Sequence, residues 1–310
     1  MGYTVSGLTD YVKQDASKVI YAQLFSEIPT LKYAEIQTGI KTSETINIVS
    51  TRPTIQAAAC SFNASGTTTF TQRVITVGKS KIDMKWCEAE LETKYTSEAM
   101  KAGSNYDSLT FEKQIFGDTM QYTATQIEKT IWMGNTTSGD QTLKQFDGLV
   151  KILTGATLGG TYSGTSWSQA NSRTVMLGLA ALVVANTDVW NGGATKVKFF
   201  MNPAMAQQYR WKLMQDNVGF TNAYQDQNTK KTFVEGTDIE IVEVYGLAGE
   251  NRIYAIETGN LFIGTDLENE QEKVQFWKSA DNGNELRLHL GWKMGTQVAF
   301  PDRIYDYRGV

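Results

Sequence analysis

Hydrophobic and polar positions along this chain follow helical patterns in three early segments. Apolar residues recur every three or four positions from about Leu8 to Phe25, which predicts a helix that ends before Pro29. A charged segment from Glu88 to Lys101 predicts a second, short helix. The strongest helical pattern covers residues 109–132, and at about 1.5 Å per residue it predicts a spine roughly 36 Å long. Its apolar stripe consists of Phe116, Met120, Ala124, Ile127 and Ile131.

Between Thr45 and Glu88 the pattern changes to the alternation that is typical of strands. Apolar and polar residues alternate in TINIVSTRPTIQ, and again in FTQRVITVGKSKIDMKW after a turn-rich stretch. The sequence therefore predicts one long two-stranded excursion, with a polar tip near residues 63–69. Because a lone hairpin is only marginally stable in water, we expect this one to lie on something else, such as a neighbouring subunit.

The remaining pattern predicts an α+β chain whose C-terminal half is rich in strands. Residues 135–171 are expected to form loops or irregular strands around one apolar island, FDGLVKIL. Two further helices are predicted, at about 172–186 and from Pro203 to about Gln215. Strands are predicted at 196–201, 237–244, 252–256 and 260–264, followed by a hairpin with its turn at 281–284.

Composition and charge narrow the classes of function. The chain has 310 residues, 41% of them hydrophobic, with 29 Lys and Arg against 33 Asp and Glu. A chain of this length can bury a large core without disulfides, so the two cysteines, Cys60 and Cys87, are predicted to be ordinary thiols. The net charge of −4 argues against a dedicated nucleic-acid binder. Neither a signal peptide nor an apolar run of membrane-spanning length is visible, so we expect a soluble, intracellular protein without membrane contact.

The candidate chemistry in the sequence is sparse. The single histidine, His289, falls on the polar side of a predicted strand. The segment Gly78-Lys79-Ser80 lacks the helix that should follow a phosphate-binding loop, and its preceding glycine is replaced by Arg73. The acidic run 266–272 lacks the glycine and glutamate of a calcium loop. We therefore predict no cofactor, no metal site and no catalytic residue, although a carboxylate-dependent enzyme stays an alternative.

Three lysines, Lys79, Lys81 and Lys85, are predicted to share one face of a strand. They fit either a charged edge that prevents unwanted strand pairing or a contact with an acidic neighbour.

The order of these elements resembles that of the major capsid proteins of tailed bacteriophages, which have the Hong Kong-type fold also used by encapsulins. The segment TFTQRVITVGKSKIDMKW resembles the returning arm of the family's extended loop, and SLTFEKQIFGDTMQYTATQIEKTIWMGN resembles its spine helix. The island FDGLVKIL, the strand-then-helix KVKFFMNPAMAQQYRW and the end GWKMGTQVAFPDRIYDY resemble later family segments. The likeness covers about Leu8 to Tyr307.

The resemblance implies a division of the chain into five parts. They are an N-terminal arm (1–44), an extended β-hairpin loop (45–88), a peripheral domain with the spine helix (89–171), an axial domain (172–264) and a returning β segment (265–310). Because the arm starts almost at Met1, scaffolding is expected to come from a separate protein or not to be needed.

The resemblance also implies a function. We expect a non-enzymatic subunit that self-assembles into pentamers and hexamers of an icosahedral virion shell, in the cytoplasm of a bacterial host. Its implied partners are further copies of itself, scaffolding, portal and decoration proteins, and packaged double-stranded DNA contacted non-specifically. The alternative is an encapsulin-like compartment. The candidate intersubunit contacts are Arg52, Arg73, Lys79, Lys81 and Lys85.

Overall fold

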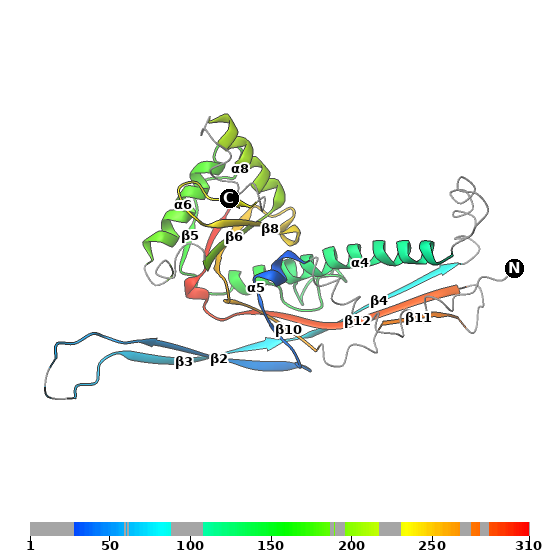
Figure 1. Ribbon diagram of the computed structural model, residues 1–310, viewed down its shortest axis with the longest axis horizontal. Coiled ribbons are helices and arrows are strands. Elements are labelled where there is room, and N and C mark those ends of the chain that lie inside the picture. Colours follow the sequence, from blue (N-terminus) through cyan, green and yellow to red (C-terminus); the bar gives the residue numbers. More distant parts are fainter. Residues whose placement is uncertain are drawn as a thin grey trace.

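Three sheets and four α-helices make up the described part of the chain (Figure 1). The computed structural model describes residues 28–58, 60, 62–87, 108–186, 189, 196–216, 231–266, 274–279 and 285–309. The predicted helices at 8–25 and 88–101 and the predicted turn at 281–284 lie outside these ranges.

A long sheet forms the base of the molecule, and its central strand is β12 (Glu285–Val298). One edge of β12 pairs with β4, antiparallel, from Glu285 opposite Cys87 to Met294 opposite Gly78. The other edge pairs first with β11 and then with β10, and β1 joins β10 in parallel. These strands are β1 (Glu35–Gln37), β4 (Gly78–Cys87), β10 (Leu261–Thr265) and β11 (Val274–Lys278).

The helix α4 (Ser108–Met133) lies along this sheet, as Figure 1 shows. Alternate residues of β12 are buried beneath it, namely Leu286, Leu288, Leu290 and Trp292. The opposing helix stripe of Met120, Ala124, Ile127 and Ile131 is buried in the same core. The predicted spine helix and these four members of its stripe are therefore confirmed, whereas the side chain of Phe116 lies outside the described part.

A six-stranded sheet packs against the C-terminal end of α4, where Trp132 shares a core with Phe200 and Tyr254 of the sheet. Its strands, in spatial order, are β5 (Gly160–Tyr162), β13 (Tyr305–Arg308), β9 (Arg252–Glu257), β6 (Val197–Met201), β8 (Glu240–Glu243) and β7 (Thr232–Phe233). Helices α6 (Ser172–Ala185) and α8 (Pro203–Gln215) cover one face, and both were predicted from sequence. Alternation along β6 sends Phe199 toward these helices and Phe200 toward the core shared with α4.

The third sheet is the hairpin of β2 (Ser43–Arg52) and β3 (Thr67–Thr76), which extends away from the body (Figure 1). It is shorter than the excursion expected from sequence. The chain leaves the hairpin at Thr76, and the next strand, β4, pairs with β12 instead. The alternating pattern continues from β3 into β4, and alternation does not reveal which partner a strand pairs with.

The last five residues of the apolar island FDGLVKIL, together with Thr154, form a short helix, α5 (Leu149–Thr154), where we expected loops or irregular strands. Leu149 and Leu153 occupy one side of its single long turn and are buried in the core under α4. Six residues are too few for helical periodicity to be distinguished from strand alternation. Three short 3-10 helices complete the described elements: η2 (Pro29–Lys32), η4 (Tyr245–Leu247) and η6 (Pro301–Arg303).

Candidate assembly surfaces

The hairpin has one face without charged side chains. Cross-strand pairs on this face are Thr45 with Val74, Asn47 with Gln72, Val49 with Phe70, and Thr51 with Thr68. Gln72 donates a hydrogen bond to the Asn47 side chain at 2.9 Å. Phe70 is 75% exposed and Val49 54% exposed, so an apolar pair lies open to solvent far from the body. This apolar pair makes the face a candidate interaction surface.

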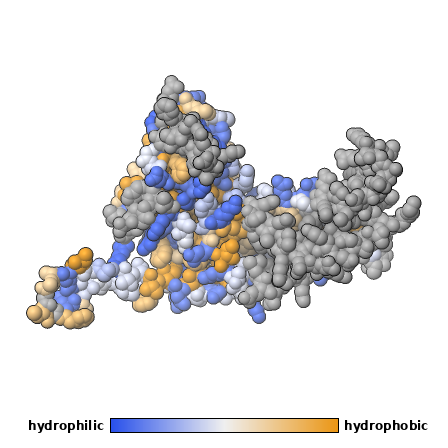
Figure 2. Space-filling model, in the orientation of Figure 1, coloured by the Kyte–Doolittle hydropathy of each residue, from blue (hydrophilic) through white to orange (hydrophobic). Residues whose placement is uncertain are grey.

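Apolar side chains also lie at the distal end of the hairpin. Ile55 and Phe62 are almost fully exposed there, and Figure 2 shows hydrophobic residues gathered at this end. The opposite end is anchored, because Ile46, Ile48 and Ile75 are buried against the body in a small core of their own. The hairpin is therefore fixed at its root and carries its exposed apolar groups outward.

The predicted contacts Arg52 and Arg73 lie on the second face of the hairpin. Arg52 is exposed at the last pair of the ladder, opposite Thr67. Arg73 is partly buried near the root and lines a polar pocket of about 550 Å³ together with Asp147, Lys151 and Asp302. The structure thus separates the two arginines along the hairpin, and they do not form one cluster.

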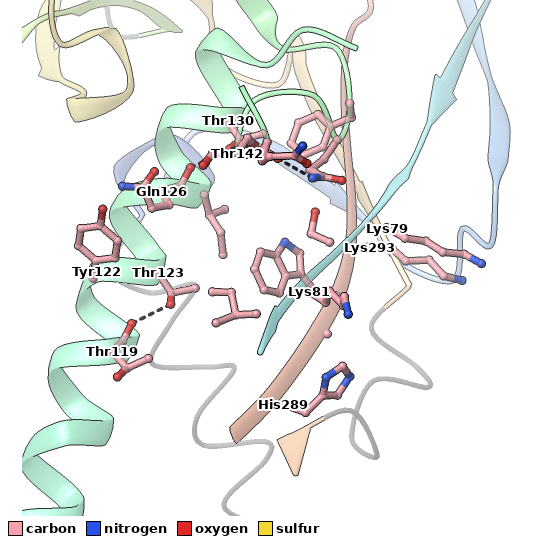
Figure 3. Close-up of a pocket in the computed structure, with 18 of the residues that line it drawn as sticks. Lys79, Lys81, Thr119, Tyr122, Thr123, Gln126, Thr130, Thr142, His289 and Lys293 are labelled. Atoms are coloured by element: carbon pink, nitrogen blue, oxygen red, sulfur yellow. Dashed lines mark hydrogen bonds between the residues drawn. The ribbon is translucent and has the colours of Figure 1, made fainter. Parts of the chain in front are cut away.

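The predicted lysines of β4 are all exposed. Figure 3 shows the side chains of Lys79 and Lys81 pointing away from α4, and Lys85 shares their face of the strand by alternation. Lys79 lies opposite Lys293 and Lys85 opposite Arg287 in the β4–β12 ladder. Lys293 binds Asp266, and Lys81 binds Asp83 in its own strand. Glu285 lies 4.0 Å from Lys85 and 3.1 Å from Arg287, so a carboxylate accompanies each of these like-charged pairs.

His289 lies on this same surface, as its polar position predicted. Its Nδ1 contacts a carboxylate oxygen of Asp83 on the neighbouring strand. The hydrogen bond from Lys81, with that from His289, lowers the pKa of Asp83 below its ordinary value. Lys81, Asp83 and His289 thus form one polar network across two neighbouring strands.

A groove of about 1390 Å³ lies between α4 and the strands of the long sheet. Figure 3 shows Thr119, Tyr122 and Gln126 along the helix side of this groove. Ile82, Met84 and Trp292 line it from β4 and β12. The lining also includes the helix hydroxyls of Thr119 and Thr123, and Lys79, Lys81, His289 and Lys293 from the strands. The groove thus combines an apolar surface with positively charged side chains, and two of the predicted contact lysines lie in it.

Other chemistry is scarce in the described ranges. They contain no group of three or more His, Cys, Asp or Glu side chains suited to a metal ion. Cys60 and Cys87 are both free thiols and exposed. None of the helices in this part of the chain has the length and apolarity that a membrane crossing requires.

Two buried carboxylates that sequence analysis missed lie where the helix meets the six-stranded sheet. Glu128 on α4 is 1% exposed and accepts a hydrogen bond from the Thr30 hydroxyl at 2.6 Å. Burial raises the pKa of Glu128 to about 7, against the opposing effect of hydrogen bonds from Thr30 and Trp132. A Glu in the middle of a helix gives no sequence signal of this kind, because its partner Thr30 is remote along the chain.

Glu240 on β8 is the second buried carboxylate. Lys198 and Lys231 bind its two oxygens at 2.8 and 2.9 Å, and the Tyr33 hydroxyl donates to it at 3.1 Å. Burial alone would raise the pKa of Glu240, but the hydrogen bonds from the two lysines outweigh it and lower that pKa. Burial, together with the smaller effect of the neighbouring Glu240 carboxylate, raises the pKa of Tyr33 to about 12.

Comparison with known proteins gives matches through structure alone. No protein-family model matches the sequence, and no curated protein matches it. The capsid of Myoviridae phage XM1 matches with a TM-score of 0.54 and 13% identity, over 89% of each chain. The procapsid of satellite phage P4, which includes the size determination (Sid) protein, matches with a TM-score of 0.60 and 9% identity, over 94% of this chain and 90% of that one.

A virus-like particle from Pyrococcus furiosus also matches, with a TM-score of 0.52 and 10% identity, over 94% of this chain and 96% of that one. At these identities the likeness establishes the fold. The chain has the α+β fold of phage major capsid proteins, the Hong Kong-type fold that the sequence resemblance implied.

Proposed function

We propose that the chain is a structural subunit that self-assembles into the icosahedral capsid shell of a tailed bacteriophage and encloses double-stranded DNA. The observation that carries this proposal is the projecting hairpin, whose uncharged face holds the exposed pair Val49 and Phe70. Leaving such a face in water is unfavourable, and a second copy of the chain can cover it. The match to phage capsids over most of the chain supports the same reading.

In the proposed shell, the hairpin overlies a neighbouring subunit and α4 stiffens the peripheral domain. Residues 172–264, the proposed axial domain, gather around the axis of each pentamer or hexamer. Many modest interfaces then add up to a strong shell. The proposed charged contacts between subunits are Arg52, Arg73, Lys79, Lys81 and Lys85, which are exposed or line the polar pocket at the hairpin root.

The proposed partners are further copies of this chain, with scaffolding, portal and decoration proteins joining during assembly in the bacterial host cytoplasm. Contact with DNA is proposed to be non-specific, which fits a net charge of −4. The subunit is proposed to act without catalysis and without a cofactor.

A second candidate is a compartment shell of the encapsulin type that encloses protein cargo. The match to the virus-like particle from Pyrococcus furiosus supports it, because that match covers nearly the whole of both chains. The two candidates differ in what the shell contains, so purified particles distinguish them: copurifying nucleic acid favours the capsid and a copurifying enzyme favours the compartment.

Negative-stain electron microscopy tests the proposal directly. The protein is expressed alone and then together with the products of neighbouring genes. Closed shells, or tubes of capsomers, are the expected result in at least one of the two samples. Uniform small particles in both samples would contradict a shell function and direct attention to the groove beside α4 as a ligand site.

A further inference from the structure

One short turn of the chain forms hydrogen bonds both to helix α4 and to the six-stranded sheet. The turn consists of η2 and the next residue, Pro29–Tyr33, and we call it the clasp turn. Its Thr30 hydroxyl donates to Glu128 of α4 at 2.6 Å. Its Tyr33 hydroxyl donates to Glu240 of the six-stranded sheet at 3.1 Å. Two buried carboxylates on different elements therefore hold a segment of five residues between them.

Aromatic rings surround the clasp turn and connect the same two elements. The ring of Trp132 on α4 lies 5.5 Å from that of Phe200 and 5.8 Å from that of Tyr254, both on the six-stranded sheet. Tyr33 meets Phe200 edge-on, with centroids 5.8 Å apart. The Trp132 indole also donates to the Thr30 hydroxyl at 2.7 Å. The hydroxyl of Thr30 thus lies at the centre of the junction between helix and sheet.

The two carboxylates differ in how their charge is balanced. Glu240 has two lysine partners, Lys198 and Lys231. Glu128 has no ion-pair partner among the described residues, and its Oε2 lacks any hydrogen-bond donor there. An ionised carboxylate that is buried without a countercharge is unfavourable, and for Glu128 this burial outweighs the hydrogen bonds from Thr30 and Trp132, which favour the ionised form.

The titratable groups on the elements packed around Glu128 do not compensate it. Lys32 on η2, Lys129 on α4 and Tyr245 on η4 are all exposed. Gly246 of η4 approaches the Glu128 main chain so closely that a Cβ there would lie 2.4 Å from its carbonyl oxygen. Glu240 interacts with the clasp turn through Tyr33 rather than through Thr30. The carboxyl of Glu128 therefore titrates in an uncharged pocket.

We propose that the clasp turn is a proton-controlled latch between α4 and the six-stranded sheet, closed while Glu128 is protonated and opened when that carboxyl ionises. On ionisation the proton passes to solvent and the carboxylate moves toward water. Thr30 then loses its acceptor, and the hydrogen bond from Trp132 loses its anchor. Tyr33 stays bound to Glu240, so the turn opens only on the helix side.

The pH window follows from the two pKa values of Glu128. The pKa is about 7 in the closed latch, and in the open latch it returns to the ordinary value of 4.5. Because the pKa is raised in the closed state, that state is most stable relative to the open state below pH 4.5. Its stability relative to the open state decreases as the pH rises to 7. Since one pKa unit is a tenfold change, the latch is expected to open roughly 100-fold more at pH 8 than at pH 5.

Hydrogen exchange followed by mass spectrometry tests this on the unassembled full chain at pH 5 and pH 8. Rates are corrected for the intrinsic effect of pH, and peptides that cover residues 28–34 and 120–133 are compared. The wild-type chain is expected to show the roughly 100-fold increase in opening in these peptides. The variant Glu128→Gln, which is neutral at both pH values, is expected to show no increase.

Glu240→Gln is the matched control. The pKa of Glu240 is lowered, so this group stays ionised from pH 5 to pH 8, and its replacement leaves the pH-dependent increase in place. A wild-type chain without the increase, or an increase that persists in Glu128→Gln, would overturn the proposal. If Glu128→Gln fails to fold, Thr30→Val serves instead, and it is expected to be open at both pH values. The latch lies within one chain, so this result is independent of whether shells form.

Discussion

The main chains of Gly134 and Gly148 are in direct contact, where α4 ends and α5 begins. The amide of Gly148 donates to the Gly134 carbonyl at 2.8 Å. A Cβ on Gly148 would lie 2.5 Å from the Gly134 nitrogen and 2.7 Å from the Trp132 carbonyl oxygen, both of which are main-chain atoms. Such atoms cannot move aside without shifting the end of α4, which carries Trp132, the hydrogen-bond donor to Thr30 of the clasp turn.

We predict that Gly148→Ala lowers the free energy of unfolding by about 2 kcal/mol or more, because it overpacks this contact. Gly155→Ala is the matched control, since the atom nearest to its new Cβ is 3.7 Å away. That control is expected to change stability by less than about 0.5 kcal/mol. Urea unfolding of both variants measures the difference, and equal stabilities would contradict the close approach.

Glu240 gives a prediction about acid. Its lowered pKa means that its stabilising contribution is present above pH 4.5 and is lost as the pH falls through the folded-state value. Glu240→Gln leaves Lys198 and Lys231 without their carboxylate, so we expect a loss of stability of about 3 kcal/mol at pH 7 that becomes smaller as the pH falls below 4.5.

Urea unfolding at the two pH values measures this loss. Glu250→Gln is the control, because Glu250 forms only a partly exposed ion pair with Arg252 at 3.4 Å. It is expected to change stability by less than about 1 kcal/mol at either pH. A loss in Glu240→Gln that is the same at pH 7 and pH 3 would show that the charge is not responsible.

At the scale of elements, the hairpin uses one face for packing against the body and leaves the other face exposed. At its root the second face contributes Ile46, Ile48 and Ile75 to a core, while the first face carries Val49 and Phe70 in water. Substitutions on the first face should therefore leave the fold intact. They report on association instead.

We predict that Phe70→Asp abolishes shell formation without lowering the melting temperature, because Phe70 is 75% exposed and its burial occurs only between copies. Thr71→Asp adds the same charge to the adjacent, exposed position on the other face and is expected to assemble. Electron microscopy counts the shells and circular dichroism follows the melting. Normal shells from Phe70→Asp would remove this face from the proposed interface.

Elements with a long, regular pattern could be predicted from the sequence, and those defined by remote partners could not. The stripe from Met120 to Ile131 identifies α4, and the alternation around Thr45 identifies a strand of the hairpin. The partner of β4 lies about 200 residues away on β12, and no local pattern encodes that choice. Thr30 and Glu128 are likewise 98 residues apart, so the contact between the clasp turn and α4 forms only in the folded chain.

The whole molecule consists of a packed body and one projection. Every described residue of the hairpin beyond Ile48 on β2 and before Thr71 on β3 is exposed or only partly buried. The body keeps its cores of the long sheet and the six-stranded sheet without these residues. The projection is therefore separable from folding in a way that neither sheet is.

We predict that a chain in which Ile48 is joined to Thr71 through an Asn-Gly turn folds normally but does not assemble. The root pairs from Ser43–Thr76 to Ile48–Thr71 are retained, and Asn-Gly suits a two-residue hairpin turn. Near-ultraviolet circular dichroism and the melting temperature report the fold, and electron microscopy reports the shells. Intact shells from this chain would show that the projection is dispensable for assembly.

The junction at Thr76 has a mechanical consequence. One residue, Val77, separates the returning strand β3 from β4, and Figure 1 shows β4 leading onward into the body. A pull on the far end of the hairpin is therefore delivered to β4 along its own length. The bonds between β4 and β12 run across that direction, from Gly78 to Cys87, so they share the load together in shear instead of breaking one after another from an end. Tension between neighbouring molecules would therefore load all the hydrogen bonds between β4 and β12 together.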